Sequence, residues 1–153
     1  MYHHESLLID YVAQSNLIEG IRRPPTPQEV AAHRNILELD CIEIGDLSNF
    51  VNVCQPGAKL RSAMGMDVRV GDHIPPFGGP EIVDKLRRLL KMVNEWQLTP
   101  VAVHVLYERL HPYMDGNGRS GRALYLWQVT REGVMPHDFL KDFYLRTLRE
   151  AAN

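Results

Sequence analysis

The sequence predicts a predominantly helical fold, and three observations support this. Apolar residues recur at intervals of three and four over most of the chain, as they do on one face of a helix. A proline stands in the first turn of three of these segments, a position that favours a helix start. Segments with strand-like alternation are too few to build a parallel sheet. The predicted helices cover residues 4–18, 26–41, 46–55, 80–96, 99–111, 119–131 and 137–151.

Local signals justify the N-terminal helices in turn. The first carries apolar side chains at near-helical spacing, and the pair Glu19-Gly20 is typical of a helix end. The second follows a proline-rich joint, where Thr26 suits the N-cap, Pro27 the first turn and Glu29 the capping-box position. The third is short and is closed by a Gln-Pro-Gly sequence.

A glycine-punctuated segment separates these helices from the rest of the chain. Residues 57–75 combine glycines with a short apolar-polar alternation, so we predict a small β-hairpin there and call it the flap. Pro80 then opens an amphipathic helix, and the pair Thr99-Pro100 opens the next one.

Size and composition limit the classes of function. The 153 residues, 44% of them hydrophobic, suffice for one domain with its own core, and we expect residues 1–153 to form a single domain. A net charge of −2 argues against a broadly basic surface that binds nucleic acid. No apolar run approaches the roughly 20 residues that cross a bilayer. Cys41 and Cys54 lack CxxC spacing and no signal peptide is visible, so we expect reduced, buried thiols in a cytoplasmic protein.

Residues 111–122, His-Pro-Tyr-Met-Asp-Gly-Asn-Gly-Arg-Ser-Gly-Arg, hold more chemical groups than packing requires. They contain Gly-x-Gly-x-x-Gly, but that dinucleotide fingerprint needs a preceding strand inside a βαβ unit. The preceding segment instead begins with a helix-start signal and keeps helical periodicity. A nicotinamide-dependent enzyme is therefore the least favoured interpretation, and we expect a helix, a tight turn and a second helix over residues 99–131.

The turn itself has the composition of an anion site. Gly116 and Gly118 can take positive φ, so the N–H groups of residues 116–119 could converge at the N-terminus of the next helix. Arg119 and Arg122 are three residues apart and therefore share one helix face, where they offer directional contacts to phosphate oxygens. The pattern predicts a phosphate-binding loop.

Two further side chains suit reactions at phosphate. Asp115 is a hard oxygen ligand beside the loop, the kind of group that holds Mg²⁺ while phosphates and waters complete its coordination. His111 stands at the far side of the turn, where a neutral imidazole could take a proton from an incoming hydroxyl.

This stretch closely resembles the signature of the Fic family, His-x-Phe-x-Asp/Glu-Gly-Asn-Gly-Arg-x-x-Arg, and departs from it only at Tyr113, where phenylalanine is usual. The resemblance implies a compact, all-α Fic domain and transfer of AMP from ATP to a protein hydroxyl. It also implies a base at His111, a magnesium ligand at Asp115 and nucleotide binding by the glycine loop and the two arginines. The catalytic residues carried over are His111, Asp115, Asn117, Arg119 and Arg122, and the nucleotide-binding ones are Gly116, Asn117, Gly118, Arg119 and Arg122.

A second resemblance lies in Ser-Asn-Leu-Ile-Glu-Gly, where Ser15 and Glu19 share one helix face. A glutamate at a helix end is ordinarily a solvated carboxylate. These residues are similar, however, to the family's inhibitory motif, Ser/Thr-x-x-x-Glu-Gly/Asn, whose glutamate pairs with the second arginine of the signature. The resemblance implies that residues 4–20 form an inhibitory helix and that Glu19 pairs with Arg122, which blocks productive seating of the ATP γ-phosphate.

The resemblance leaves several alternatives open. The same site could remove AMP, use another nucleotide donor, or belong to a poorly active nucleotide-binding regulatory module. The expected partners are ATP, with Mg²⁺ as cofactor, and a protein target whose Ser, Thr or Tyr hydroxyl docks on the flap. A homo-oligomer is possible, and no nucleic acid or membrane partner is expected.

Overall fold

A computed structural model describes residues 2–152 of the chain, and residues 1 and 153 fall outside the described part. Within it, seven helices account for all the regular structure apart from isolated β-bridges, so the all-α prediction is confirmed. No helix in this part is long and apolar enough to cross a membrane. The helices are α1 (Tyr2–Ile18), α2 (Pro27–Leu37), α3 (Ile44–Cys54), α4 (Pro80–Asn94), α5 (Pro100–Leu110), α6 (Asn117–Arg131) and α7 (Phe139–Ala152).

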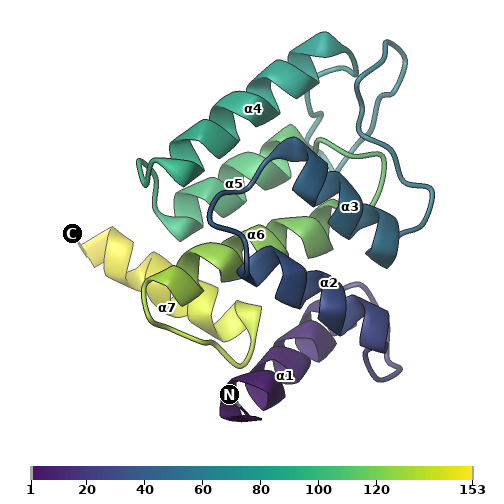
Figure 1. Cartoon of the computed structure of the whole chain (residues 1–153). Helices are drawn as coiled ribbons and strands as arrows, with labels where there is room; N and C mark the ends of the chain where they lie inside the picture. Colours follow the sequence, from purple (N-terminus) through teal and green to yellow (C-terminus); the bar gives the residue numbers. More distant parts are fainter. Residues whose placement is uncertain (1, 153) are drawn as a thin grey trace.

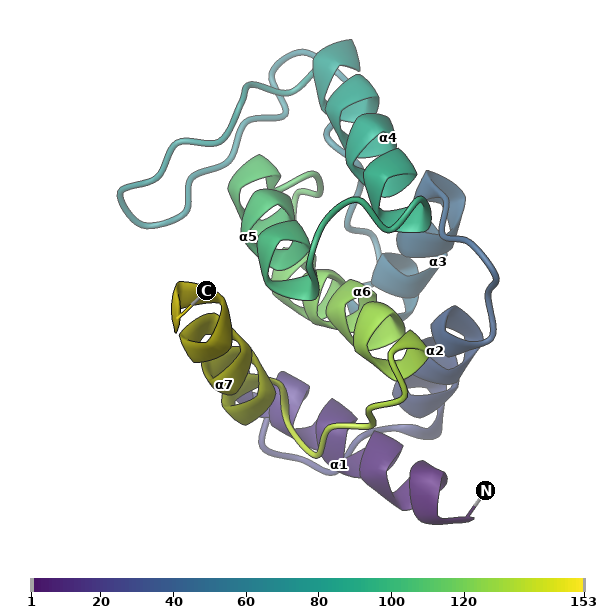
Figure 2. The ribbon, with the colours of Figure 1, turned by 90° about the vertical axis from the view of Figure 1, so that its left-hand side faces the viewer.

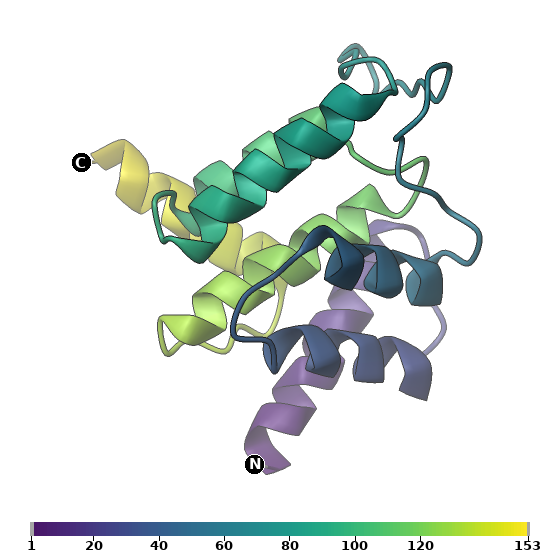
Figure 3. The same ribbon diagram turned by 45° about the horizontal axis from the view of Figure 1, so that its top comes forward.

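Helix α6 is the centre of the fold, with the other helices arranged around it (Figures 1 and 3). Every residue from Arg119 to Val129 is buried, so this helix has no solvent face. A helix that is surrounded in this way loses the one-sided apolar pattern of a surface helix. Its position also explains how two arginines of the loop motif come to lie in the interior.

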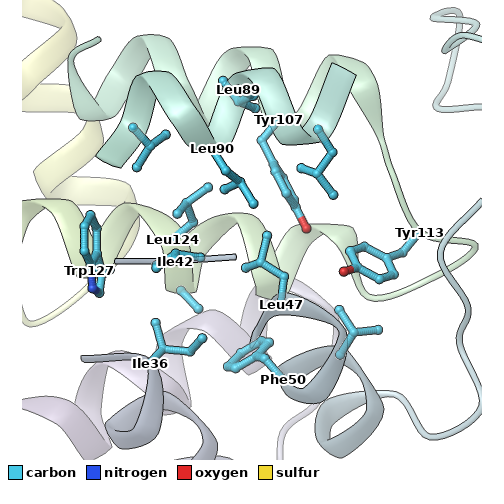
Figure 4. Packing of buried hydrophobic residues seen from close by; sticks show 14 of the residues in the cluster. Ile36, Ile42, Leu47, Phe50, Leu89, Leu90, Tyr107, Tyr113, Leu124 and Trp127 are labelled. Atoms are coloured by element: carbon cyan, nitrogen blue, oxygen red, sulfur yellow. The ribbon is translucent and has the colours of Figure 1, made fainter. Parts of the chain in front are cut away.

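The apolar core forms on two sides of α6. The larger cluster joins α6 to α2, α3, α4 and α5, and its side chains converge on a common centre (Figure 4). The smaller cluster joins α6 to α1, α2 and α7 through residues such as Tyr11 and Tyr125. Helix α1, which carries Ser15 near its C-terminal end, is therefore packed against the central helix from its N-terminal half onward.

The predicted start of α2 is confirmed, but its predicted end is wrong. Thr26 and Glu29 form a reciprocal capping box. The helix stops at Leu37 rather than at Cys41, because Arg131 and Trp127 of α6 donate hydrogen bonds to the carbonyls of Leu37, its last residue, and of Leu39 just beyond it. The chain then turns away and leaves Cys41 exposed, which corrects the expectation that both thiols are buried; Cys54 is buried.

The flap projects as a long two-armed loop beside α4 and α5 (Figure 2). Its arms meet at a two-residue turn in which Val70 and His73 exchange backbone hydrogen bonds of 3.0 and 2.9 Å. No further bridge joins the arms, so the β-hairpin predicted over 57–75 is reduced to this one bridge. Side chains replace the ladder, since Arg61 and Asp67 bond to backbone groups across the loop.

Candidate active site

The loop motif joins α5 to α6 and lines a cleft of about 430 Å³. Besides the motif, the walls of the cleft include Glu19 and Ile21 from the segment after α1, and Gln55 from the end of α3. Three segments that are distant in sequence therefore meet at one polar cleft, because α1 and α3 both pack against α6.

His111 stands at the C-cap of α5 in a left-handed conformation, with φ of 50°. Its Nδ1 lies 3.3 Å from the carbonyl oxygen of Glu108. Because a carbonyl oxygen only accepts, this contact favours the proton on Nδ1 and leaves the lone pair of Nε2 free. Burial lowers the pKa of His111, and the nearby charges of Arg61 and His73 lower it further. The imidazole is thus held neutral, as a general base must be.

Backbone N–H groups at the start of α6 form an anion cradle. Gly116 is the N-cap, with φ of 80°, and the first intrahelical bond runs from Ser120 N to Gly116 O at 3.0 Å. The N–H groups of residues 117–119 consequently have no acceptor in the described part of the chain. The N–H of Gly116 is engaged by Asp115 Oδ1 at 2.8 Å, so the cradle begins one residue later than the sequence predicted.

Gly118 is required for space rather than for a positive φ, which corrects the expectation from sequence. A Cβ at this position would overlap with Glu19 Oε1 and would come within 3.0 Å of Arg122 Nη1. The carboxylate of Glu19 therefore lies directly over the first turn of α6, where a bound anion would be favoured by the helix terminus.

The side chain of Arg122 is almost completely buried, and Ser15 and Glu19 at the end of α1 accept its hydrogen bonds. Its Nε donates to Ser15 Oγ at 2.7 Å, and its Nη2 donates to the Ser15 carbonyl at 3.1 Å and to Glu19 Oε1 at 2.6 Å. Ser15 is fully buried, whereas the Glu19 side chain is 40% exposed. The structure thus brings together the three residues that the inhibitory motif singled out.

The local backbone explains why Glu19 points at α6. Gly20, with φ of 77°, ends α1 in a Schellman motif: Gly20 N bonds to Leu17 O at 2.9 Å and Ile21 N bonds to Asn16 O at 3.0 Å. Glu19 is the C-cap residue of this motif. A carboxylate at a helix C-terminus is unfavourable, so the pair with Arg122 offsets a local electrostatic cost.

Comparisons with known proteins agree with this geometry. Residues 57–129 match the model of the Fic/DOC family. Over this stretch, just under half of the chain, the protein is similar to Fic/DOC proteins. A probable protein adenylyltransferase of Aquifex aeolicus is 30% identical over 80 residues, which is 50% of this chain and 25% of that protein. The protein adenylyltransferase Fic of Drosophila melanogaster is 35% identical over 75 residues, 45% of this chain and 15% of that protein. The chain therefore spans only a minor part of the relatives it matches.

The side chain of Asn117 holds the loop in shape through hydrogen bonds to the backbone of Tyr113. Its side chain accepts from Tyr113 N at 2.9 Å and donates to Tyr113 O at 2.8 Å, and it is buried. Both ends of the amide are thus engaged by one residue of the loop. Only the backbone N–H of Asn117 faces an incoming phosphate, so its side chain acts by holding the cradle in shape.

Arg119 is also engaged by the protein. Its Nη2 donates to Cys54 O at 2.8 Å and to Gln55 Oε1 at 3.0 Å, and its Nη1 lies 3.5 Å from Glu29 Oε2. The side chain still lines the cleft. Burial would raise the pKa of Glu29, but hydrogen bonds from Arg23 and Thr26 and the charge of Arg23 lower it to about 2, so this carboxylate stays charged opposite Arg119.

The departure from the family signature at Tyr113 has a structural partner. The Tyr113 ring is buried in the larger core cluster, and its hydroxyl lies 2.8 Å from Ser48 Oγ on α3. The extra hydroxyl is therefore satisfied, and it links the loop to α3. The tyrosine keeps the packing of an aromatic residue and adds contacts to Ser48 Oγ and, at 3.4 Å, to the carbonyl of Ile44.

Nothing in the sequence indicated that three further residues lie near the site. Glu29 showed only its capping pattern, and the lone Arg61 showed none. Glu108 faces Gly121 of α6, where the absence of a side chain lets α5 approach closely. Burial raises the pKa of Glu108 to about 7, with the charge of Arg122 opposing the rise and that of Glu19 adding to it. All three act through contacts between segments far apart in sequence.

Asp115 is the exposed carboxylate at the mouth of the cleft. The described part of the chain contains no group of three or more His, Cys, Asp or Glu side chains that could hold a metal by themselves. One carboxylate beside a phosphate cradle nevertheless fits Mg²⁺, which keeps several waters and takes its other ligands from substrate phosphates. The residues present suit a metal that arrives with a nucleotide.

Proposed function

We propose that this protein transfers AMP from ATP to a hydroxyl group of a target protein. The observation that carries the proposal is the cleft that His111 and the N–H cradle of α6 share, whose wall includes Glu19, the partner of Arg122. The names of the relatives, which are protein adenylyltransferases, support the same reaction. The cradle and the arginine suit the triphosphate, and the imidazole suits a hydroxyl nucleophile.

The reaction follows from these positions. The target hydroxyl loses its proton to His111 Nε2 while its oxygen attacks the α-phosphorus of ATP. The new O–P bond forms as the bond to the bridging α–β oxygen breaks, and pyrophosphate leaves. The protein contributes mainly position and charge, since the loop supplies donors rather than a covalent nucleophile.

Asp115 would hold Mg²⁺ bound to the phosphates, and that ion would supply neutralisation of the charge on the leaving group. Asp115 Oδ1 accepts from Gly116 N, which orients the carboxylate. Both oxygens keep lone pairs that could bind the metal.

We infer that the contact of Glu19 with Arg122 inhibits this reaction in the absence of a signal. The carboxylate occupies the guanidinium and lies over Gly118, so a γ-phosphate cannot reach either group while Glu19 is in place. A closed-to-open ratio of 10:1 requires about 1.4 kcal/mol. A hydrogen bond between charged groups contributes about 1.5–3 kcal/mol, and the partial exposure of Glu19 places this pair towards the lower end.

The test uses ATP labelled at either the α- or the γ-phosphate with wild type, Glu19→Gly and the double variant Glu19→Gly/His111→Ala. We expect α-label on protein with Glu19→Gly, about 10-fold above wild type, and a loss of 10²- to 10⁴-fold when His111 is also replaced. Because Glu19 is partly exposed, its replacement leaves the fold intact, which a thermal melt checks.

Each other outcome contradicts a part of the proposal. Transfer of the γ-label would indicate a kinase. ATP binding without transfer of either label would indicate a regulatory nucleotide-binding module. Equal activity of wild type and Glu19→Gly at saturating Mg²⁺ would exclude inhibition by Glu19. Release of AMP from an already modified protein, without transfer from ATP, would indicate the reverse reaction.

A further inference from the structure

A second hollow, larger than the active-site cleft, lies between the flap, α4 and α5, whose arrangement is visible in Figure 2. Its volume is about 720 Å³, against about 430 Å³ for the cleft. We call it the basic groove. One end of it is fixed, because His73 Nε2 of the flap donates to the carbonyl of Arg109 on α5 at 2.8 Å.

The charge of the basic groove is of one sign. Lys85, Arg88 and Arg109 line it together with His73, and no acidic residue does. Lys85 pairs with Glu81 at 3.3 Å, whereas Arg88 and Arg109 form no ion pair within residues 2–152. The chain as a whole carries a net charge of −2, so this local excess complements an acidic ligand.

The floor of the basic groove is aliphatic. Leu89 and Leu110 are buried beneath it, and Ile74 and Leu106 are 63% and 42% exposed at its walls. No Phe, Tyr or Trp lines the groove. Single-stranded nucleic acids are bound by cations together with aromatic stacking platforms, so the lining favours an acidic peptide with an aliphatic side chain.

The basic groove lies next to the catalytic base. Leu110 immediately precedes His111 in the chain, and Arg109 is two residues away. At a rise of about 1.5 Å per helical residue, these positions are only about 2–3 Å apart along the axis of α5. An extended peptide covers about 3.3 Å per residue, so a peptide with a side chain in the groove could reach His111 within a few residues.

We propose that the basic groove binds a segment of the target protein in which an aliphatic side chain is flanked by Asp or Glu, within a few residues of the modified hydroxyl. This inference rests on the proposed AMP transfer and adds the class of substrate. The flap would hold the peptide backbone, and the groove would select the sequence.

Binding is measured first, because it does not require catalysis. Three fluorescent 12-residue peptides share a central serine and carry Asp-Leu-Asp, Lys-Leu-Lys or Gly-Ser-Gly three residues away. We expect fluorescence anisotropy to show binding of the acidic peptide by wild type, weakened at least 10-fold in Arg88→Glu/Arg109→Glu. Arg87→Glu is the matched control, since Arg87 neighbours Arg88 on α4 but pairs with Asp84 and lies outside the groove.

Equal binding of the three peptides, or an equal effect of the groove and control variants, would overturn the inference. So would stronger competition by single-stranded DNA than by the acidic peptide. Self-association of wild type that the groove variant abolishes, seen by analytical ultracentrifugation, would assign the surface to a second copy of the chain. Thermal melts verify that the exposed Arg88 and Arg109 can be replaced without unfolding.

Transfer is measured next in the Glu19→Gly background with α-labelled ATP. We expect a lower KM for the acidic peptide and a rise in that KM, with little change in kcat, when Arg88 and Arg109 are reversed. If the protein modifies itself but shows no preference for the acidic peptide, the inference about the groove is wrong and the proposed AMP transfer still holds. Acidic peptide binding without any transfer overturns the proposed function and leaves the groove standing.

Discussion

Two regions hold the active-site loop, and they do so with different kinds of contact. At the end of α1, Ser15 and Glu19 bind the side chain of Arg122. In the flap, Arg61 donates to backbone carbonyls, with Nε to His111 at 2.7 Å and Nη2 to Leu110 at 2.9 Å. The first region holds a side chain of α6 through the hydroxyl and carbonyl of Ser15 and the carboxylate of Glu19, and the second fixes the backbone at His111.

Burial separates the two regions further. Arg61 is fully buried, and its Nη1 also donates to the carbonyls of Met66 and Pro76, so one guanidinium joins both arms of the flap to the end of α5. In the contact between Glu19 and Arg122, by comparison, the Glu19 side chain is 40% exposed. We therefore expect the protein to stay folded when the Glu19 contact is lost, and to be strongly destabilised when the Arg61 contacts are lost.

The largest expected effect comes from breaking the buried region. Arg61→Leu leaves four carbonyl groups without their donor, and hydrogen bonds from a charged group contribute about 1.5–3 kcal/mol each. We expect a loss of at least about 3 kcal/mol in the free energy of unfolding, measured by urea denaturation.

The matched control for Arg61 is Arg69→Leu on the same flap. Arg69 is exposed, and its Nε donates only to Gly71 O at 3.1 Å. We expect a change within about 0.5 kcal/mol. Similar losses for the two variants would contradict the distinction between the regions.

Ser15 and Glu19 test whether the inhibitory contact itself has a fixed and a releasable part. Ser15→Ala removes a buried acceptor from Arg122 and is expected to cost about 1.5–3 kcal/mol of stability. Glu19→Gln removes a half-exposed charge and is expected to cost less than about 1 kcal/mol, while it raises AMP transfer. Urea denaturation and the α-label assay measure both quantities, and a larger stability loss for Glu19→Gln would reverse the assignment.

The helix starts could be predicted from sequence because their signals are local. Thr26 and Thr99 both accept from the N–H three residues on, as their sequence pattern indicates. The end of α2 could not be predicted, since it depends on Trp127 and Arg131, about 90 residues further along the chain. Likewise the motif indicated candidate site residues, but the contacts of Arg61 and the pairing of Arg119 with Glu29 arise only when distant segments meet.

A double-mutant cycle between Gly118 and Glu19 tests their close approach. Gly118→Ala in wild type forces Glu19 away from α6, because the new methyl group overlaps with its carboxylate. In the Glu19→Gly background the overlap with Glu19 is gone, and the better helix propensity of alanine contributes up to about 1 kcal/mol. We expect Gly118→Ala to be more favourable in the second background by about 1 kcal/mol. Additive effects in urea denaturation would show that the two residues do not touch.

The smallest expected effect is on the pKa of His111. Two charged side chains of the flap lower this pKa, and Glu19 is not among its causes. The pKa of His111 lies below its usual 6.5, first because of burial and then because of the Arg61 and His73 charges, with the Glu108 carbonyl and Asp115 opposing them. The neutral base should therefore persist as the pH falls through 6.5, and transfer should be lost only at lower pH. NMR titration of the imidazole measures the midpoint. The His111→Gln variant identifies the signal of His111. This assignment is needed because burial also lowers the pKa of His33 and His104 to about 4.

The same titration compares the two regions directly. His73→Asn should raise the midpoint of His111 by a few tenths of a pH unit, since it removes one neighbouring positive charge. Glu19→Gln should leave the midpoint unchanged, because the Glu19 carboxylate acts on Arg122 rather than on the base. A midpoint that moves with Glu19 and not with His73 would mean that the end of α1 governs both the arginine and the imidazole, and the division of the loop into a releasable and a fixed region would then be wrong.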